Sequence, residues 1–341
     1  MRRCRATPAC RTCAGGWVLD PGVRHDVGVN DARPDAIPAP AAPVPAPAAA
    51  DLRLDRLGLV VHPRRQIDTA LDNARAWAAA NGAELVQIAV SGQERVVADL
   101  GAIESCDLVV AVGGDGTTLH ALHAAAKVSR PVLGIACGSL GALTAVNAAD
   151  VGEALERVAA GAWSPRRLPG LAITGAHGRS RIALNDVVVV RAGPSQVLIE
   201  IEVDGQRYVR YAGDGLVVAT PVGSSAYTLA AGGPILAERS DGIVLTPLAP
   251  HGGCCPPLVV GSASAVGILV EPGYAGARLE FDGQPDEEQP TELRAARVEG
   301  YATLVGLGDA EPLLAGLRAR KIIIDSPRVL ARDEREALGR G

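Results

Sequence analysis

The sequence predicts an α/β N-terminal domain with a parallel sheet, followed by a mostly antiparallel β, sandwich-like C-terminal domain. Between residues 54 and 160, short apolar runs alternate with segments of helical periodicity, which is typical of a parallel sheet covered on both faces. After residue 165, strand patterns follow one another with little helix between them, which favours antiparallel pairing. The run at 108–112 is valine-rich and ends at Gly113 and Gly114, as expected of a strand buried on both faces.

In the N-terminal half, Asp68 is predicted to be the N-cap of a helix that Gly82 ends. Thr117 or Thr118 is predicted to cap the helix that follows Gly116. Strands are expected at 57–61, 84–90, 108–112 and 131–136, and helices at 68–81, near 94–100, after 116 and at 150–160. Ligands of a parallel sheet bind at the carboxyl ends of its strands, and two of these strands end there in a glycine turn.

In the C-terminal half, Asp204-Gly205 is a two-residue hairpin signal of the type I′ kind. Strands are expected at 181–191, 196–203, 206–211, 215–220, 243–246, 258–260, 265–271, 278–281 and 301–307. The only clear helix start in this half lies at 223–227.

The chain is predicted to divide into four parts. Residues 1–52 form a Pro/Ala-rich disordered leader and linker, because the segment 37–50 consists almost entirely of proline and alanine. The arginines at its start are compatible with an organelle transit peptide, but an unstructured leader is favoured. Residues 53–164 form the α/β domain, 165–325 the β domain and 326–341 a C-terminal tail.

Composition excludes several classes of partner. The 33 basic and 38 acidic residues give a net charge of -5, and no basic stripe is present, so neither nucleic acid nor a membrane surface is expected as a partner. The apolar runs are too short to span a bilayer. Seven cysteines without a disulfide framework favour a reducing, cytoplasmic location, and Cys10-x-x-Cys13 lacks the second pair that a zinc site needs.

The segment 113–117, G-G-D-G-T, is the centre of the candidate site. A strand, a glycine turn and a helix N-terminus together present backbone N–H groups and a positive dipole end, which suit a phosphate. Asp115 would repel a bound polyphosphate unless a metal ion or a proton transfer uses its carboxylate, so it indicates chemistry at this turn. The alternative is a plain strand-to-helix connection.

Two common nucleotide sites are excluded. The chain has only two lysines, Lys127 and Lys321, and neither stands in a G-x-x-x-x-G-K-[ST] loop. The glycines at 134, 138 and 141 miss the G-x-G-x-x-G fingerprint of a dinucleotide-binding Rossmann domain. His120 and His123 have a spacing compatible with metal binding, but without a carboxylate or cysteine cluster they are interpreted as ordinary core or surface residues, and no metal ligand is assigned.

Several motifs in this order resemble the NAD kinase family over residues 54–325. They are V-V-H-P at 60–63, G-G-D-G-T at 113–117, N-D at 185–186, G-D-G-L-V-V-A-T-P-V-G-S-S-A-Y at 213–227, A-G-G-P at 231–234, T-P-L-A-P-H at 246–251 and D-G-Q at 282–284. G-G-D-G-T alone also resembles diacylglycerol kinases, sphingosine kinases and phosphofructokinases. The fifteen-residue run is far more specific.

The resemblance implies an enzyme that phosphorylates NAD to NADP, with ATP as donor and Mg²⁺ or another divalent cation as cofactor. Asp115 would be the general base that takes the proton of the 2′-hydroxyl of the adenosine ribose. Gly113, Gly114, Gly116 and Thr117 would bind phosphates. The NAD site would comprise Asn185, Asp186, Asp214, Ser225, Ala226 and Tyr227. It would lie partly across a subunit boundary, so a homo-oligomer with a shared active site is implied.

Three alanines replace residues usual in the family pattern. Ala136 and Ala142 stand where the second glycine turn usually has Asn and Phe, and Ala230 stands where Ser is common. Two alternatives therefore stay open at this point: a lipid or small-alcohol kinase that shares G-G-D-G-T, and a non-catalytic nucleotide-binding regulator. Asn185 and Asp186 also permit a bulge or a strand-end turn, and Tyr227 permits ordinary packing.

Overall fold

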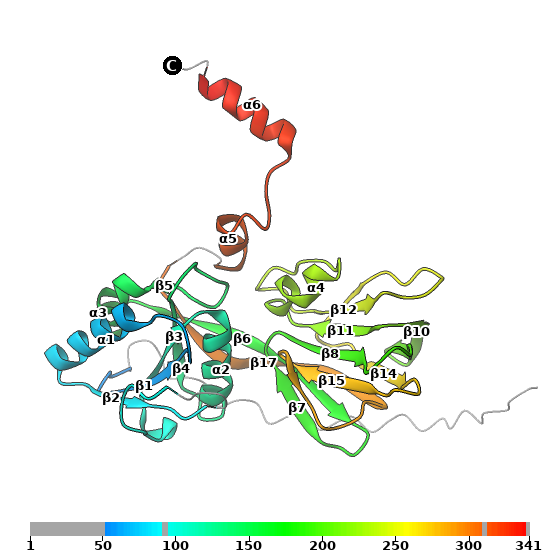
Figure 1. The fold of residues 1–341 in the computed structure, drawn as a ribbon, viewed down its shortest axis with the longest axis horizontal. Coiled ribbons are helices and arrows are strands. Elements are labelled where there is room, and N and C mark those ends of the chain that lie inside the picture. Colours follow the sequence, from blue (N-terminus) through cyan, green and yellow to red (C-terminus); the bar gives the residue numbers. More distant parts are fainter. Residues whose placement is uncertain (1–51, 91–94, 309–311, 339–341) are drawn as a thin grey trace, which may run out of the picture. The chain divides into compact units, whose positions relative to one another are not determined.

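The computed structural model describes residues 52–90, 95–308 and 312–338 (Figure 1). Residues 1–51, which include Cys10-x-x-Cys13 and almost all of the predicted leader, lie outside this range. In the part of the chain that is described, no helix is both long enough and apolar enough to cross a membrane.

The N-terminal part alternates strands and helices as predicted. Its elements are β1 (Arg56–Val61), α1 (Asp68–Asn81), β2 (Glu84–Gln87), η2 (Ile103–Ser105), β3 (Leu108–Gly113), α2 (Asp115–Ala126), β4 (Pro131–Ala136), β5 (Val146–Asn147), η3 (Ala148–Asp150) and α3 (Val151–Ala159). The strand order β2-β1-β3-β4 is parallel throughout, and β5 continues it next to β4. The predicted parallel sheet is therefore confirmed.

Helices cover both faces of this sheet because successive strand residues point to opposite sides. Val110 and Val112 of β3 face α1 and α3, where Leu71 and Leu155 are buried. Val109 of β3 belongs to a second buried cluster with α2. All six residues of β3 are buried, which explains why the strand reads as a continuous apolar run.

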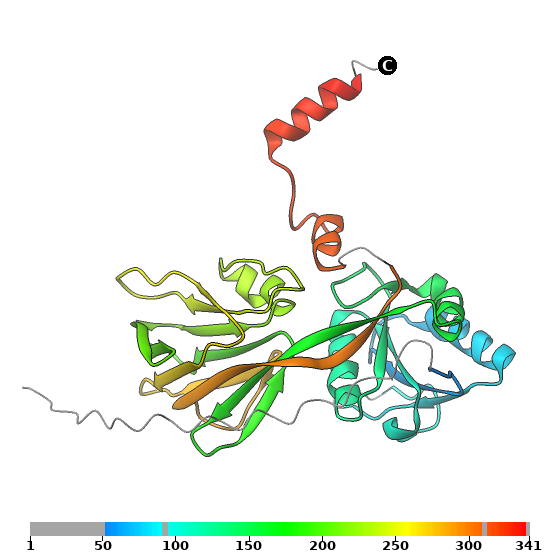
Figure 2. The ribbon, with the colours of Figure 1, turned by 180° about the vertical axis from the view of Figure 1, so that it is seen from behind.

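The C-terminal part is mostly antiparallel, as predicted (Figure 2). Its elements are β6 (Ser164–Gly175), β7 (Ser180–Ala183), β8 (Asp186–Arg191), β9 (Val197–Val203), β10 (Gln206–Gly213), β11 (Gly215–Ala219), η4 (Gly223–Ser225), α4 (Tyr227–Ala230), β12 (Ile243–Leu248), β13 (Leu258–Val260), β14 (Val266–Glu271), β15 (Ala277–Phe281), β16 (Gln284–Pro285) and β17 (Glu292–Gly306). Asp204 and Gly205 both have positive φ, at 53° and 75°, as a type I′ turn requires.

Two sheets enclose the β core. The first contains eleven strands in the order β10-β9-β14-β17-β4-β3-β1-β2, with β5, β6 and β7 beside this path, and the second has the order β13-β12-β11-β8-β15-β16. Ile199 and Ile201 of the first sheet share one buried cluster with Val187 and Leu216 of the second. This face-to-face packing confirms the sandwich-like architecture.

The long strand β6 was not predicted, and β17 was predicted only over 301–307. β17 pairs with β14 and β6 in antiparallel fashion and then with β4 in parallel, so the first sheet is continuous from the α/β part into the β part. The predicted domain boundary at 164/165 falls at the start of β6. The four-part division itself stays a prediction.

Three further details of the N-terminal part differ from the expected secondary structure. Ile67, not Asp68, is the N-cap of α1. Gly114 precedes α2 in extended conformation, so the helix begins at Asp115 and neither Thr117 nor Thr118 caps it. The Thr118 hydroxyl instead donates to the Gly114 carbonyl oxygen at 3.1 Å.

The third error is the helix expected near 94–100, since the described residues 95–100 form none. The buried Gln87 side chain explains the difference. Its amide donates to the carbonyl oxygen of Arg95 at 2.7 Å and accepts from the N–H of Val97 at 2.7 Å. The side chain thus offers the backbone an alternative to helical hydrogen bonds.

Two helices follow β17 along the chain. They are α5 (Pro312–Ala319) and α6 (Pro327–Leu338). Most of the segment predicted to be a C-terminal tail is therefore helical.

Candidate active site

Three loops leave the carboxyl ends of β1, β3 and β4 side by side. The N–H of His62, just after β1, donates to Val112 of β3 at 2.9 Å, and the N–H of Cys137, just after β4, donates to Gly113 at 2.9 Å. The two predicted glycine turns therefore lie next to each other at one edge of the sheet, where parallel sheets bind their ligands.

Asp115 is the first residue of α2, and its carboxylate is held by the second glycine turn. Oδ2 accepts from the N–H of Ala142 at 2.8 Å, and Oδ1 accepts from the N–H of Leu143 at 3.0 Å. A Cβ at Gly141 would overlap this carboxylate, so only glycine lets the two turns approach so closely. The side chain of Asp115 remains 35% exposed. The carboxylate is fixed in orientation and still accessible to a ligand.

The four predicted phosphate-binding residues have different environments. Gly116 is exposed, and nothing would contact a Cβ added there, so its backbone is open to a ligand. Gly114 is half-buried in extended conformation. Gly113 and Thr117 are buried against each other, because a Cβ at Gly113 would overlap the Thr117 hydroxyl. Open backbone at the start of a helix suits an anion.

Arg65 is a basic residue at this site that sequence analysis did not select. Its Nη1 lies 3.1 Å from where a Cβ of Gly114 would be and 3.5 Å from that of Gly138, so the guanidinium lies over both glycine turns. His62 Nδ1 accepts from the N–H groups of Arg64 and Arg65 and so shapes this loop. Burial, with Arg65 and Arg64 nearby, lowers the pKa of His62.

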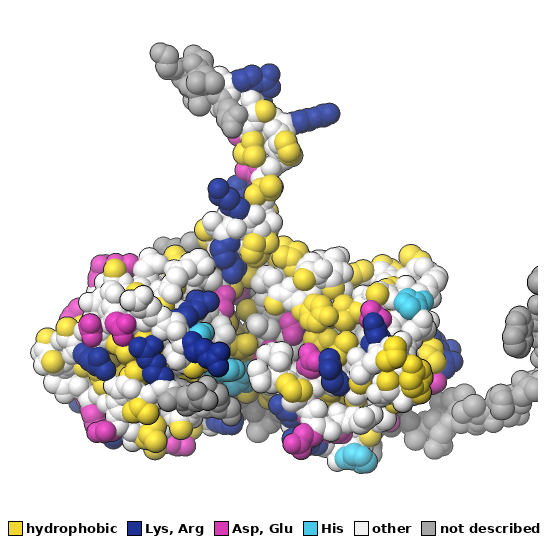
Figure 3. Space-filling model, viewed as in Figure 1, with side chains coloured by type: hydrophobic (Ala, Val, Ile, Leu, Met, Phe, Trp, Pro, Cys, Tyr) yellow, Lys and Arg dark blue, Asp and Glu magenta, His cyan; other side chains and the backbone are white. Residues whose placement is uncertain are grey.

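In the space-filling view, basic and histidine side chains gather in the middle of this face, beside the position of α2 in Figure 1 (Figure 3). The sequence does contain a signal for Arg65. It follows the first predicted strand, and the glycine turns follow neighbouring strands of the same parallel sheet, so all of them are expected at the same end of the sheet.

Asn185 and Asp186 lie where β7 ends and β8 begins, so the strand expected at 181–191 is interrupted. The Asp282 carboxylate accepts from three successive N–H groups, those of Leu184 at 2.9 Å, Asn185 at 2.7 Å and Asp186 at 3.1 Å. The same carboxylate lies 2.6 Å from His123 Nε2 of α2. Asp282 is only 6% exposed and ties this segment to α2.

Asp186 is a buried carboxyl group with an unusual pKa. Burial and, secondarily, the neighbouring Asp282 raise its pKa from 3.8 to about 7, although the N–H of Tyr227 hydrogen-bonds to it and lowers it. The group therefore changes its protonation near neutral pH.

Tyr227 and Asp214 line a common cavity of about 560 Å³, together with Arg191 and Arg278. Tyr227 is 42% exposed, and Arg191 Nε donates to Asp214 at 2.6 Å. Ala226 is exposed, whereas the Ser225 hydroxyl donates to the Val222 carbonyl oxygen at 3.0 Å. The N–H of Tyr227 connects this group to Asp186, so five of the predicted NAD-binding residues are linked within the β part and Asn185 adjoins them.

The two halves of the chain each match a domain of known proteins. Residues 57–163 match the ATP-NAD kinase N-terminal domain, and residues 184–303 match the ATP-NAD kinase C-terminal domain. The NAD kinase of Geotalea daltonii is 34% identical over 209 residues, which are 59% of this chain and 74% of that protein. The chain belongs to the NAD kinase family.

Other NAD kinases agree with this assignment. The enzyme of Heliobacterium modesticaldum is 38% identical over 190 residues, which are 54% of this chain and 67% of that protein. A crystal structure of yeast NADH kinase complexed with NADH has a TM-score of 0.67 and 19% identity and covers 81% of this chain and 90% of that one. An NAD kinase from Archaeoglobus fulgidus in complex with ATP has a TM-score of 0.63 and 24% identity, with coverages of 77% and 98%. These two structures support the fold.

Two of the alanines that depart from the NAD kinase family pattern lie at the second glycine turn. Ala136 is buried at the end of β4, and Ala142 is 7% exposed and packs against Leu313 and Leu317 of α5. In this family member, the alanine at position 142 is therefore covered by apolar side chains of α5. Ala230 is exposed at the end of α4.

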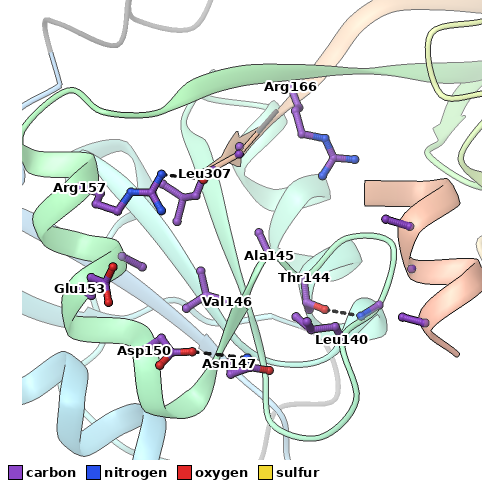
Figure 4. A pocket seen from close by; sticks show the side chains of 17 residues that line it. Leu140, Thr144, Ala145, Val146, Asn147, Asp150, Glu153, Arg157, Arg166 and Leu307 are labelled. Atoms are coloured by element: carbon purple, nitrogen blue, oxygen red, sulfur yellow. Dashed lines mark hydrogen bonds between the residues drawn. The ribbon is translucent and has the colours of Figure 1, made fainter. Parts of the chain in front are cut away.

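A cavity of about 450 Å³ is lined in part by the second glycine turn, at Leu140 and Thr144 (Figure 4). Gly141 and Gly316 contribute to its lining, but Asp115 does not. Its two arginines are already engaged: Arg157 donates to the Leu307 carbonyl oxygen at 2.7 Å, and Arg166 is 2.6 Å from Glu238. In this NAD kinase family member, the cavity therefore offers no arginine that is free of a protein partner among the described residues that line it.

Among the described residues of this family member, no three His, Cys, Asp or Glu side chains come together as a metal-ligand set. His123 is bound to Asp282, whereas His120 is exposed. The two histidines of α2 therefore lie in different environments.

Proposed function

We propose that this chain transfers the γ-phosphoryl group of ATP to the 2′-hydroxyl of the adenosine ribose of NAD, giving NADP, with Asp115 as the general base. The proposal rests on family membership and on one observation, the Asp115 carboxylate held at the glycine turn by the N–H groups of Ala142 and Leu143. A carboxylate so oriented beside backbone phosphate donors is suited to receive the hydroxyl proton.

The step balances with the groups named. The ribose oxygen forms a bond to the γ-phosphorus, the bond from that phosphorus to the β–γ bridging oxygen breaks, ADP leaves with the electron pair, and Asp115 takes the proton. Gly113, Gly114, Gly116 and Thr117 would bind phosphates at the start of α2, where the helix dipole favours negative charge. The ATP complex of the Archaeoglobus fulgidus relative supports ATP as the donor.

The dinucleotide would lie along the β part. Asn185, Asp186 and Asp214 offer amide and carboxyl groups for hydroxyl and amino groups of NAD, and Ser225, Ala226 and Tyr227 would line the same site. The NADH complex of yeast NADH kinase supports a dinucleotide in this fold. Because Ala226 and Tyr227 are exposed, a second copy of the chain can reach them. We propose a homo-oligomer with a shared active site.

A divalent cation is proposed to accompany ATP. Mg²⁺ usually keeps several waters and binds through one or two carboxylates plus substrate phosphates. The glycine turn offers one carboxylate, Asp115, which is proposed as the base, so the residues fit a cation held mainly by the nucleotide. Such an ion would neutralise charge on the phosphates. We propose Mg²⁺ as this cation. We also propose a cytoplasmic location, because the cysteines form no disulfide framework.

The two alternatives are disfavoured. A lipid or small-alcohol kinase would share G-G-D-G-T alone, whereas both halves of this chain match the ATP-NAD kinase domains. A non-catalytic regulator is disfavoured because two of the relatives are NAD kinases, and the match to this chain covers 67% and 74% of their length.

The test is the variant Asp115→Asn. We expect NADP formation from NAD, ATP and Mg²⁺ to fall by about two to four powers of ten, since a general base contributes on that order, while ATP binding persists. Asp72→Asn is the matched control, because Asp72 lies on α1 with its side chain 72% exposed. An Asp115→Asn enzyme with wild-type turnover would overturn the role of Asp115.

A further inference from the structure

The helix α5 packs directly on the second glycine turn. Leu313 is 1% exposed and Leu317 is fully buried, and both belong to one buried cluster with Ala142. A Cβ at Gly316 would lie 3.1 Å from the Gly141 carbonyl oxygen, which is tighter than an ordinary contact. The C-terminal segment is therefore part of the wall of the proposed site.

The end of α5 fixes the position of Arg320. Lys321 has φ 57°, its N–H donates to the Arg318 carbonyl oxygen at 2.9 Å, and the N–H of Ile322 donates to that of Leu317 at 3.0 Å. This pair of bonds is a Schellman motif, which makes Arg320 the C-cap residue. The Arg320 side chain is anchored as well, because Nε donates to the Gly316 carbonyl oxygen at 3.1 Å.

The anchored guanidinium faces Asp115. Arg320 Nη1 lies 3.9 Å from Asp115 Oδ2, a distance longer than a hydrogen bond. In the described part of the chain, neither Nη1 nor Nη2 of Arg320 makes a hydrogen bond, whereas Asp115 already accepts from two backbone N–H groups. Arg320 is 27% exposed, so its free donors are open to a ligand beside the carboxylate.

We propose that Arg320 binds the phosphoryl group in transfer and is a catalytic residue supplied by the C-terminal segment; this inference rests on the proposed function. During transfer, charge spreads over the equatorial oxygens of the γ-phosphoryl group, and a planar guanidinium can bind two of these oxygens at once. The chain has only two lysines, and neither Lys127 nor Lys321 stands in a P-loop, so arginine is the side chain suited to bind phosphate beside the proposed cation.

The test compares Arg320→Ala with Arg320→Lys and with the matched control Arg318→Ala. Arg318 lies two residues earlier, is 58% exposed and pairs with Asp325 at 2.9 Å. We expect Arg320→Ala to lower kcat about a thousandfold or more, as loss of a transition-state arginine does, with KM for NAD little changed. Arg320→Lys should retain part of the rate, free guanidinium ion should restore part of the rate of Arg320→Ala, and Arg318→Ala should behave as wild type.

The outcomes separate this inference from the proposed function. A wild type that forms no NADP would overturn both. A wild type that forms NADP, together with an Arg320→Ala enzyme of unchanged kcat, would overturn the inference alone. Two further outcomes would also overturn the inference. One is a lower rate that a lowered midpoint of thermal unfolding explains. The other is a shift of the acid limb of the pH–rate profile without rescue by guanidinium. Arg320 would then support the fold or the base and would not bind the phosphoryl group.

Discussion

His123 Nε2 lies 2.6 Å from Asp282 Oδ2, so the helix that begins at Asp115 is hydrogen-bonded to the turn that holds the Asn185 and Asp186 backbone. From Asp115 to His123 the helix rises about 12 Å. The phosphate-binding turn and the proposed NAD-binding residues are therefore connected through one buried carboxylate. Tyr301 supports the contact, with its ring edge-on to His123 at 6.0 Å between centroids.

Replacing Asp282 with Asn should weaken this connection. An amide keeps only one acceptor oxygen for three N–H donors, so we expect the free energy of unfolding to fall by about 1–3 kcal/mol and KM for NAD to rise. Urea unfolding and steady-state kinetics measure both effects. Asp325→Asn is the control, since its exposed carboxylate pairs with Arg318, far from Asp282 in the sequence. Unchanged stability and KM would show that the connection contributes nothing.

Replacing Gly141 with Ala should displace the Asp115 carboxylate, because the new Cβ would overlap it. A misplacement of about 1 Å at a reacting group can cost roughly a hundredfold in rate, so we expect kcat to fall by that order while the enzyme stays folded. The control is Gly152→Ala on α3, where nothing lies within 4 Å of the new Cβ. It should leave kcat unchanged and stabilise the helix by about 0.5–1 kcal/mol. Equal kcat values for the two variants would contradict the proposed position of the base.

The fold was largely predictable because buried strands and amphipathic helices leave periodic apolar patterns. The strand β6 was not, since Pro165, Pro169 and Gly170 break its pattern, although the strand pairs with β17 on both sides of a register shift. The extended backbone of Gly114 explains the wrong cap of α2. Such details depend on pairing partners that are distant in sequence.

The candidate site was predictable only where its residues are adjacent in sequence. The segment 113–117 is such a case, and the bend that it forms depends on local glycines. Arg65, Arg320 and the His123–Asp282 contact are different, because each joins segments that are far apart in the chain. Nothing in the spacing of these residues shows that the sheet and α5 bring them to one place.

The buried Asp186 should make stability depend on pH. Its pKa is about 7 in the folded protein and near 3.8 when exposed, so between these values the folded state holds a proton that the unfolded state has lost. The proton on Asp186 therefore contributes fully to the free energy of unfolding below about pH 4. This contribution, on the order of a few kcal/mol, is lost as pH rises towards 7. Comparing urea unfolding of the wild type and Asp186→Asn from pH 5 to pH 8 tests this. The advantage of the Asn variant should grow with pH, and a constant difference would contradict the raised pKa.

Replacing Arg65 with Gln should weaken ATP binding. The guanidinium lies over Gly114 and Gly138, and among the described residues it has no hydrogen-bond partner, so its donors are available to a polyphosphate. Loss of a charge-assisted hydrogen bond to phosphate should raise KM for ATP roughly tenfold or more, with a smaller effect on KM for NAD. Arg64→Gln, one residue away on the same exposed loop, is the control. If both variants raised KM for ATP equally, general positive charge and not the position of Arg65 over the turns would account for nucleotide binding.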